Sequence, residues 1–145
     1  MLVGRFGNTS RAPYIEALVS FPRLGQRGPV SFLMDSGADG SVLMPVDGKK
    51  LGIDYPTLRN PTTSTGIGGL AHGFEELCVI AFADSRYVYS YLLNRMEISV
   101  PTKENFRFPS LLGRDILNRW RVVLDYPHGK AHCTPQDWDQ RQKIS

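Results

Sequence analysis

The segment Ser31–Leu43, with the sequence SFLMDSGADGSVL, strongly limits what this chain can fold into. The apolar run Val30–Met34 ends abruptly at the carboxylate of Asp35, and small residues follow directly. Glycine at position 37 accepts backbone angles that a Cβ atom forbids. This pattern predicts a buried strand that ends in a tight turn, with an acidic side chain at a place that substrate can approach. An ordinary turn capped by Asp35 itself would explain the same residues.

The size and composition of the chain fit one folded domain. A chain of 145 residues buries roughly two-thirds of its unfolded surface on folding. Its 14 glycines and 10 prolines favour many turns and therefore short strands. We expect a domain over residues 1–134 and a polar C-terminal tail over residues 135–145 that is frayed.

Several features bear on the cellular context. No window approaches the roughly 18 uninterrupted apolar residues that a membrane span needs, and the first residues lack the apolar core of a signal peptide. Only two cysteines are present, Cys78 and Cys133, which fits a reducing compartment better than a disulfide framework. The sequence therefore predicts a cytoplasmic protein without a membrane partner.

The charge pattern and the side chains that could bind metal exclude some other functions. The net charge is +3, but the basic residues are scattered and form no stripe or recognition motif. We therefore expect no nucleic-acid partner, although a basic β-barrel that binds nucleic acid stays a third hypothesis, testable by its salt dependence. The residues His72, Cys78, His132 and Cys133 lack the spacing of metal ligands, so no metal site and no cofactor are expected.

The first half of the chain contains signals for a hairpin and a short helix. Arg11–Phe21 alternates between apolar and polar residues, which predicts a half-buried strand. The turn-rich segment Arg23–Gly28 joins it to a second strand at Pro29–Met34, so the two should form a hairpin that leads to Asp35. A short helix is predicted from Val46 to Leu51.

The middle of the chain predicts a second hairpin and further strands. Threonines lead into a glycine cluster within Thr62–Phe74, which predicts a hairpin with an adaptable tip. A phosphate-binding loop is the competing interpretation, but neither glycine-rich phosphate motif is present. Further strands are predicted at Tyr87–Leu93, Met96–Val100, Val122–Leu124 and Ala131–Thr134, with Tyr87, Tyr89 and Tyr91 on one face of a sheet.

A third notable segment, Leu111–Leu117, has the sequence LLGRDIL. Asp115 is a suitable N-cap for a short helix that starts there. Arg114 precedes it, and the planar guanidinium group suits a two-pronged contact with a carboxylate. We therefore expect a buried ion pair between Arg114 and Asp39.

Three segments in this order resemble those of a known family. The Asp-Ser-Gly-Ala sequence at Asp35 resembles the active-site turn of aspartic proteases, and Gly66–Gly69 resembles the flap tip of retroviral proteases. Leu111–Leu117 is similar to the corresponding segment of retropepsin-like domains. The hairpin that follows it resembles the cellular and bacterial members rather than the viral ones. The resemblance implies a mostly β, closed-barrel acid protease fold with a flap hairpin and one or two short helices.

The resemblance also implies an activity. Aspartic protease chemistry needs two carboxylates that share one proton, and this chain has only one such turn, so the expected enzyme is a homodimeric endopeptidase with Asp35 from each subunit. Its substrate would be a peptide or protein. The implied support residues of the active-site loop are Ser36, Gly37, Ala38, Asp39 and Arg114. The implied substrate-binding residues are Leu33, Gly66, Ile67, Gly68, Gly69 and Leu111, with Ala38 as a further pocket wall, and an apolar preference at the cleavage point is expected. The alternative is the same fold acting as a catalytically silent dimerisation or peptide-binding module.

Overall fold

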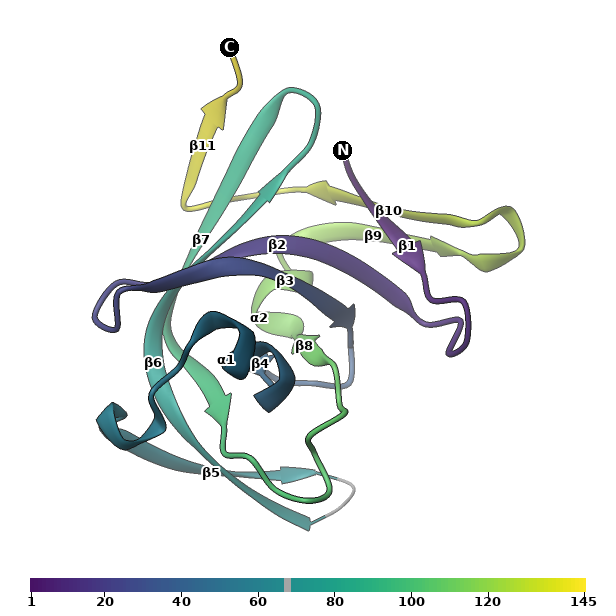
Figure 1. Cartoon of the computed structure of the whole chain (residues 1–145). Helices are drawn as coiled ribbons and strands as arrows, with labels where there is room; N and C mark the ends of the chain where they lie inside the picture. Colours follow the sequence, from purple (N-terminus) through teal and green to yellow (C-terminus); the bar gives the residue numbers. More distant parts are fainter. Residues whose placement is uncertain (67–68) are drawn as a thin grey trace.

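The structure is a computed structural model that describes residues 1–66 and 69–145 (Figure 1). Most of these residues lie in strands, and the elements follow one another in this order: β1 (Leu2–Phe6), β2 (Pro13–Phe21), β3 (Gln26–Met34), β4 (Val42–Leu43), α1 (Pro45–Leu51), η1 (Tyr55–Thr57), β5 (Asn60–Gly66), β6 (Gly69–Ala83), β7 (Tyr87–Ser99), β8 (Ser110–Leu112), α2 (Arg114–Leu117), β9 (Trp120–Asp125), η2 (Tyr126–His128), β10 (Lys130–Pro135) and β11 (Gln140–Lys143). The predicted mostly β fold with short helices is confirmed.

Six strands close into a barrel. Each strand pairs with the next in the order β2, β3, β8, β4, β7 and β6, and β6 pairs again with β2. The predicted hairpin of β2 and β3 is present, with Tyr14 opposite Leu33 at one end and Phe21 opposite Gln26 at the other. Closure pairs each of these strands on both sides along part of its length, and the parts that extend beyond the barrel pair with β1, β5 and β11.

The core fills the inside of this barrel. Alternate residues of β2, from Ile15 to Phe21, are buried as the sequence pattern predicts. Phe82 packs edge-to-face on Trp120, with ring centroids 4.7 Å apart, and Tyr91 lies against the same pair. Complete burial of an aromatic side chain of this size contributes roughly 1.5–3 kcal/mol.

Strand β7 is one long strand where the sequence predicts two. Its register with β6 shifts between the pairs Glu76–Met96 and Cys78–Leu93, so β7 contains one extra residue there. Such a bulge lets a strand bend and continue across a polar interruption, and the polar pair at residues 94–95 therefore does not end the strand.

Helix α1 agrees with the sequence signals. It runs from Pro45 to Leu51, with Pro45 in the first turn, where a missing N–H group costs nothing. Gly52 ends it in a left-handed conformation with φ of 76°, which glycine adopts without strain.

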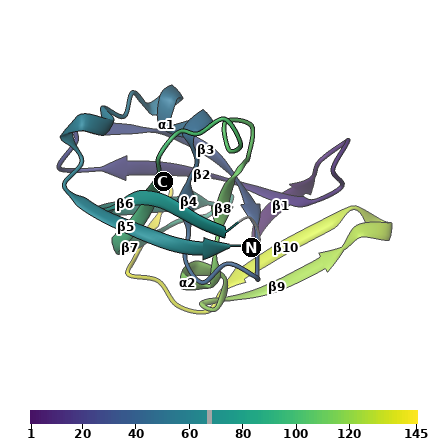
Figure 2. The same ribbon diagram turned by 90° about the horizontal axis from the view of Figure 1, so that it is seen from below.

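A smaller sheet extends the barrel at β2. Strand β1 pairs with both β2 and β10, and β10 pairs with β9. The predicted β9–β10 hairpin extends to one side of the barrel (Figure 2). Strand β1 is not predicted from the sequence, because its five residues, LVGRF, contain too little alternation to identify a strand.

The C-terminal residues are predicted to form a frayed tail, but most of them are bound to the rest of the chain. We call residues 136–143 the C-terminal strap. Its strand β11 pairs with β7 from Gln140–Ser90 to Lys143–Tyr87. Trp138 packs against Tyr89, with ring centroids 5.4 Å apart. The sequence does not predict this contact, because the strap is polar apart from Trp138. The contact depends on the packing of Trp138 and on the edge of β7 with which β11 pairs.

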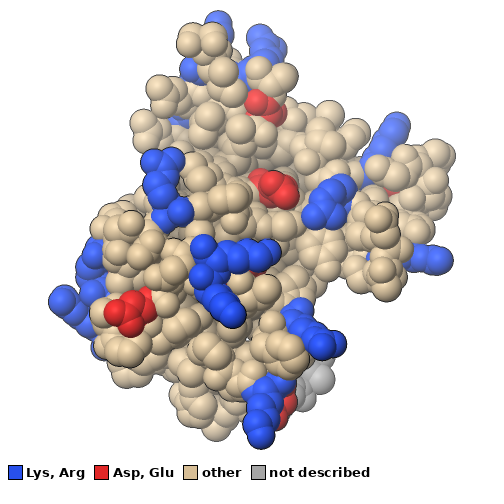
Figure 3. All heavy atoms as spheres, viewed as in Figure 1, with Lys and Arg blue, Asp and Glu red and all other residues tan. Residues whose placement is uncertain are grey.

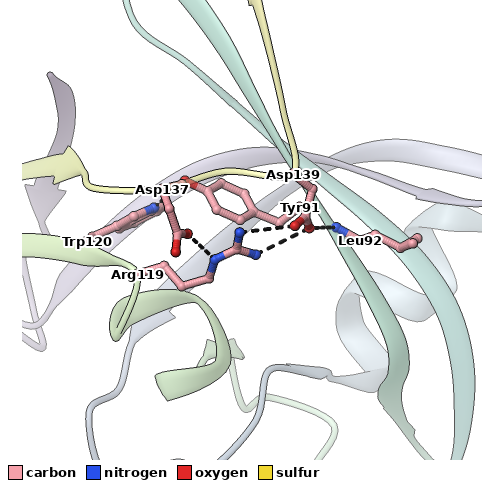
Figure 4. Close-up of polar contacts among 6 residues, drawn as sticks. All are labelled: Tyr91, Leu92, Arg119, Trp120, Asp137 and Asp139. Atoms are coloured by element: carbon pink, nitrogen blue, oxygen red, sulfur yellow. Dashed lines mark hydrogen bonds and ion pairs between the residues drawn. The ribbon is translucent and has the colours of Figure 1, made fainter.

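Polar contacts of Arg119 and Tyr91 also hold the strap (Figure 4). Arg119 pairs with Asp137 and donates to Asp139 Oδ1 at 3.0 Å. The Tyr91 hydroxyl donates to the backbone oxygen of Asp137 at 2.9 Å and accepts from Trp120 Nε1 at 2.7 Å. The strap is therefore joined to the core through Tyr91.

In the described part of the chain, no helix has the length and apolar character needed to cross a membrane.

Candidate active site

Asp35 lies at the point where β3 leaves the barrel. Strand β3 runs parallel to β8, with Leu33 opposite Leu111 and Met34 opposite Leu112. The Asp35 N–H donates to the backbone oxygen of Leu112 at 2.9 Å, which continues this pairing by one residue. The position of Asp35 is therefore fixed by two strands that are distant in sequence.

The turn after Asp35 orients its carboxylate. Gly37 N–H donates to Asp35 Oδ1 at 2.9 Å, and Ala38 N–H donates to the Asp35 backbone oxygen at 3.2 Å. This is the Asx turn that the sequence allows. Among the described residues, Asp35 Oδ2 has no hydrogen-bond partner within this chain, and the side chain is partly exposed. One oxygen is thus held in place while the other remains available for chemistry.

Arg114 joins this turn to α2. Its Nη1 atom donates to the Ser36 backbone oxygen at 2.7 Å, and its backbone N–H donates to the Ala38 oxygen at 2.9 Å. The predicted ion pair between Arg114 and Asp39 is present. The expectation that this pair is buried is wrong for the single chain, because the Asp39 side chain is 94% exposed. Asp39 projects from the turn, and in the part of the chain that the structure describes its side chain stays almost fully exposed.

A second layer of polar contacts, not predicted from the sequence, supports the turn. The Ser41 hydroxyl donates to Asp115 Oδ1 at 2.7 Å, and the Ser41 N–H donates to Asp115 Oδ2 at 2.9 Å. Gly113 N–H in turn donates to the Ser41 hydroxyl at 3.0 Å. The prediction that Asp115 caps its helix is wrong, since Gly113 occupies the N-cap position and Asp115 lies in the first turn. Asp115 instead accepts from the backbone and side-chain donors of Ser41, just before β4.

A buried serine makes an equivalent link to α1. Ser110 is fully buried, and its hydroxyl donates to Asp47 Oδ2 at 2.6 Å. The same hydroxyl accepts from Met44 N–H at 2.9 Å. Because an unsatisfied buried polar group costs about 1–3 kcal/mol, these contacts favour one arrangement of β4, β8 and α1.

Gly113 is needed because two backbone segments approach closely. A Cβ atom at Gly113 would lie 2.5 Å from both the carbonyl carbon and the oxygen of Gly40. Its φ of −95° is open to any residue, so space, and not conformation, requires glycine here. This approach brings together the segments after β3 and after β8, which contain the first and the third sequence motif.

The predicted substrate-binding residues fall into two groups. Leu33 and Leu111 are paired across β3 and β8, and both are partly exposed, as is Ala38 in the turn. Gly66 pairs with Gly69 at the end of the β5–β6 hairpin, and Gly69 has φ of 101°. The expected tip residues Ile67 and Gly68 lie outside the described residues.

Other chemistry receives no support from the described side chains. Cys78 and Cys133 are buried free thiols, and burial raises the pKa of Cys78 to about 12 and that of Cys133 to about 11. Neither is a thiolate at neutral pH, which is the form that a nucleophile needs. In the described part of the chain, no group of three or more His, Cys, Asp or Glu side chains could hold a metal ion. Lys and Arg side chains are spread over several elements of the face in Figure 3, with no continuous stripe.

Comparisons with known proteins agree with this geometry. A family model described as aspartyl protease matches residues 22–79, which include β3 and the Asp35 turn. No curated protein sequence matches the chain significantly.

Two solved structures share its fold. One is EIAV protease complexed with the inhibitor HBY-793, with 26% sequence identity and a TM-score of 0.51, covering 77% of this chain and 90% of that one. The other is a retropepsin-like aspartic protease from Rickettsia conorii, with 20% identity and a TM-score of 0.55, covering 89% of this chain and 95% of that one. The fold is that of the acid proteases. The chain shares the retropepsin-like fold of both structures, and its segment that contains Asp35 matches the aspartyl protease family model.

Proposed function

We propose that the protein is an aspartic endopeptidase that acts as a homodimer, with one Asp35 from each subunit. The observation that carries this proposal is the contact pattern of the Asp35 carboxylate: Gly37 N–H donates to Oδ1, while none of the described residues donates to Oδ2. The match to the aspartyl protease family over residues 22–79 supports it. One chain supplies one such turn, and a two-fold axis through the site would supply the second.

The reaction would use the two carboxylates in different protonation states. Two carboxylates a few ångströms apart cannot both ionise, so one stays protonated. The ionised one accepts a proton from water as the water oxygen attacks the peptide carbonyl carbon, while the protonated one hydrogen-bonds to the carbonyl oxygen. The tetrahedral intermediate then loses the amine as the C–N bond breaks and a proton passes to the leaving nitrogen.

The other residues of the turn would position the substrate and the partner turn. Ser36 is exposed beside Asp35 and would hydrogen-bond across the two-fold axis, while the Gly37 carbonyl would accept from the substrate backbone. The β5–β6 hairpin would act as a flap that closes over an extended peptide with Gly66–Gly69 at its tip. A peptide bound as an added strand sends alternate side chains into pockets, and Leu33, Ala38 and Leu111 would form the apolar walls.

The test is cleavage of a peptide mixture, analysed by mass spectrometry from about pH 4 to pH 7, the range in which a carboxylate pair serves as acid and base. Wild type, Asp35→Asn and Asp54→Asn are compared at a concentration where sedimentation shows a dimer. Asp54 is an exposed carboxylate away from the turn and serves as the matched control. Cleavage between apolar residues in wild type and Asp54→Asn, but not in Asp35→Asn, is the expected result. Dimeric protein without Asp35-dependent cleavage would favour a catalytically silent peptide-binding module.

A further inference from the structure

One row of side chains crosses the face of the sheet on which Asp35 lies. Facing positions on five neighbouring strands pair in register. The row consists of Leu33 on β3, Leu111 on β8, Val42 on β4, Glu97 on β7 and Glu75 on β6. Residues that face each other across paired strands point to the same side of a sheet, so the row continues from two leucines to two carboxylates.

The row lies on the outer face of the barrel. The neighbouring positions Phe32, Leu43 and Ile98 are fully buried in the core. All five residues of the row are partly exposed. Successive strand residues point to opposite faces, so Leu33 and Asp35, two positions apart, share a face. Glu97 and Asp35 therefore lie on the same side of the sheet.

The β5–β6 hairpin reaches over the carboxylate end of this row. The hydroxyl of Ser64, on β5, donates to Glu97 Oε2 at 3.4 Å. Gly73 on β6 leaves room for the Glu97 side chain, since a Cβ atom there would lie 3.2 Å from Glu97 Cγ. Glu97 therefore contacts both strands of the β5–β6 hairpin from the face of the sheet that it shares with Leu33.

Among the described residues, no ion pair balances the charge of these two carboxylates. Glu97 and Glu75 face each other, and neither forms an ion pair within 4.0 Å among the described residues. Burial, together with the charge of Glu75, raises the pKa of Glu97 against the opposing hydrogen bond from Ser64. A cation placed here would favour the ionised carboxylates and so offset both the desolvation penalty and the repulsion.

The spacing matches one position of a bound peptide. Neighbouring strands lie about 4.8 Å apart, so three strand steps separate Glu97 from Leu33 by roughly 14 Å. An extended peptide advances about 3.4 Å per residue, which places the second residue from the scissile bond roughly 7 Å from the bond. Because Leu33 would line the pocket at the cleavage point, a lysine or arginine side chain together with the Glu97 side chain spans the remaining distance.

We propose that Glu97, supported by Glu75, selects a basic side chain two residues from the scissile bond of the substrate. This inference rests on the proposed function, because it uses the cleft in which Asp35 would act. It adds a charged requirement to the apolar preference expected from Leu33 and Leu111, so the substrate class becomes peptides with a basic residue beside an apolar cleavage point.

The first experiment measures binding without catalysis. Fluorescent peptides Ala-Ala-X-Z-Z-Ala-Ala, in which Z is an equal mixture of Leu and Phe, are titrated onto Asp35→Asn protein, with X as arginine or its neutral isostere citrulline. We expect the arginine peptides to bind about tenfold tighter at pH 7, equivalent to about 1.4 kcal/mol. In Asp35→Asn/Glu97→Gln protein the ratio should fall to within about twofold. Asp35→Asn/Glu16→Gln, which removes an exposed carboxylate on β2, should keep the tenfold ratio.

The second experiment separates this inference from the enzyme proposal by measuring cleavage of the same peptides with Asp35 intact. Asp35-dependent cleavage without a preference for arginine would overturn the inference and leave the enzyme intact. A binding preference that Glu97→Gln removes, without cleavage by wild type, would support the inference and refute the enzyme. Equal binding of both peptides, or binding of neither, overturns the inference. Glu97→Gln is nearly isosteric, and its melting curve checks that it folds.

Discussion

The Ser41 hydroxyl donates a 2.7 Å hydrogen bond to Asp115 Oδ1 across 74 positions of sequence. Asp115 also accepts from the Ser41 backbone, and the same hydroxyl accepts from Gly113 N–H. These contacts connect the segment after the Asp35 turn with the first turn of α2. Ser41 is only 2% exposed, so water cannot readily replace a lost partner.

The variant Asp115→Ala should therefore lower the free energy of unfolding by about 2 kcal/mol, the cost of leaving buried donors without an acceptor. Urea denaturation measures this value. Ser85→Ala, in an exposed turn, is the matched control and should change stability by less than about 0.5 kcal/mol. A double-mutant cycle with Ser41→Ala should give a coupling energy between the two residues, and strict additivity would contradict a direct contact.

Gly113→Ala should be strongly destabilising. The added Cβ atom would lie 2.5 Å from the Gly40 backbone, and overpacking against a fixed backbone costs about 1–3 kcal/mol or more. Gly40→Ala is the control, since among the described residues its Cβ atom would meet Asp115 Oδ2 alone, at an ordinary contact distance of 3.6 Å. Thermal melting of the two variants distinguishes them. Equal melting temperatures would show that the two backbone segments are not in close contact.

The C-terminal strap should detach in acid. The hydrogen bond from Arg119 lowers the pKa of Asp139 against the effect of burial, and the Leu92 N–H adds to the lowering. The folded-state pKa of Asp139 is below its unfolded one. The contribution of Asp139 to the stability of the strap is therefore complete above the ordinary aspartate value of about 3.9, and it is lost as pH falls through the folded-state pKa.

Amide hydrogen exchange of β11 measures this detachment. Protection in wild type should decline below about pH 4. Asp139→Asn should already show reduced protection at neutral pH and a weaker decline in acid. The loss should be roughly 1 kcal/mol, since Asp139 is 43% exposed and solvent screens the pair. Unchanged β11 protection in the variant at neutral pH would mean that Trp138, the pairing with β7 and the contacts of Asp137 hold the strap without Asp139.

Glu97→Gln should stabilise the protein at neutral pH. Burial and the facing charge of Glu75 raise the pKa of Glu97, while the hydrogen bond from Ser64 acts in the opposite direction. A carboxyl group with a raised folded-state pKa favours folding below its unfolded pKa and loses that contribution as pH rises through the folded value. The difference in unfolding free energy between variant and wild type should therefore grow from pH 4 to pH 7. A constant difference would show that Glu97 titrates normally.

The preference for a basic residue should follow the same titration. Attraction to arginine requires the ionised carboxylate, and the titratable group that faces Glu97 is Glu75. The ratio of arginine to citrulline peptide affinity should fall with acidification, at a pH above the ordinary glutamate value of about 4.3. A ratio that stays constant down to that value would place the selecting charge elsewhere.

The sequence by itself determined the parts whose causes are local. The apolar run that ends at Asp35 and the alternation from Arg11 to Phe21 depend on strand periodicity. Gly52 ends α1 through its own backbone freedom. The turn at Asp35 is specified by its neighbours, because Gly37 is two residues away.

Tertiary structure decided the parts that depend on distant pairing. No local pattern links Ser41 with Asp115, places β11 on the edge of β7, or sets Glu97 opposite Val42 on the face of Asp35. Asp39 forms its expected pair with Arg114, but its exposure depends on which elements cover it. The physical reason is that strand register and barrel closure are fixed by the whole core at once, whereas periodicity and turn chemistry act over a few residues.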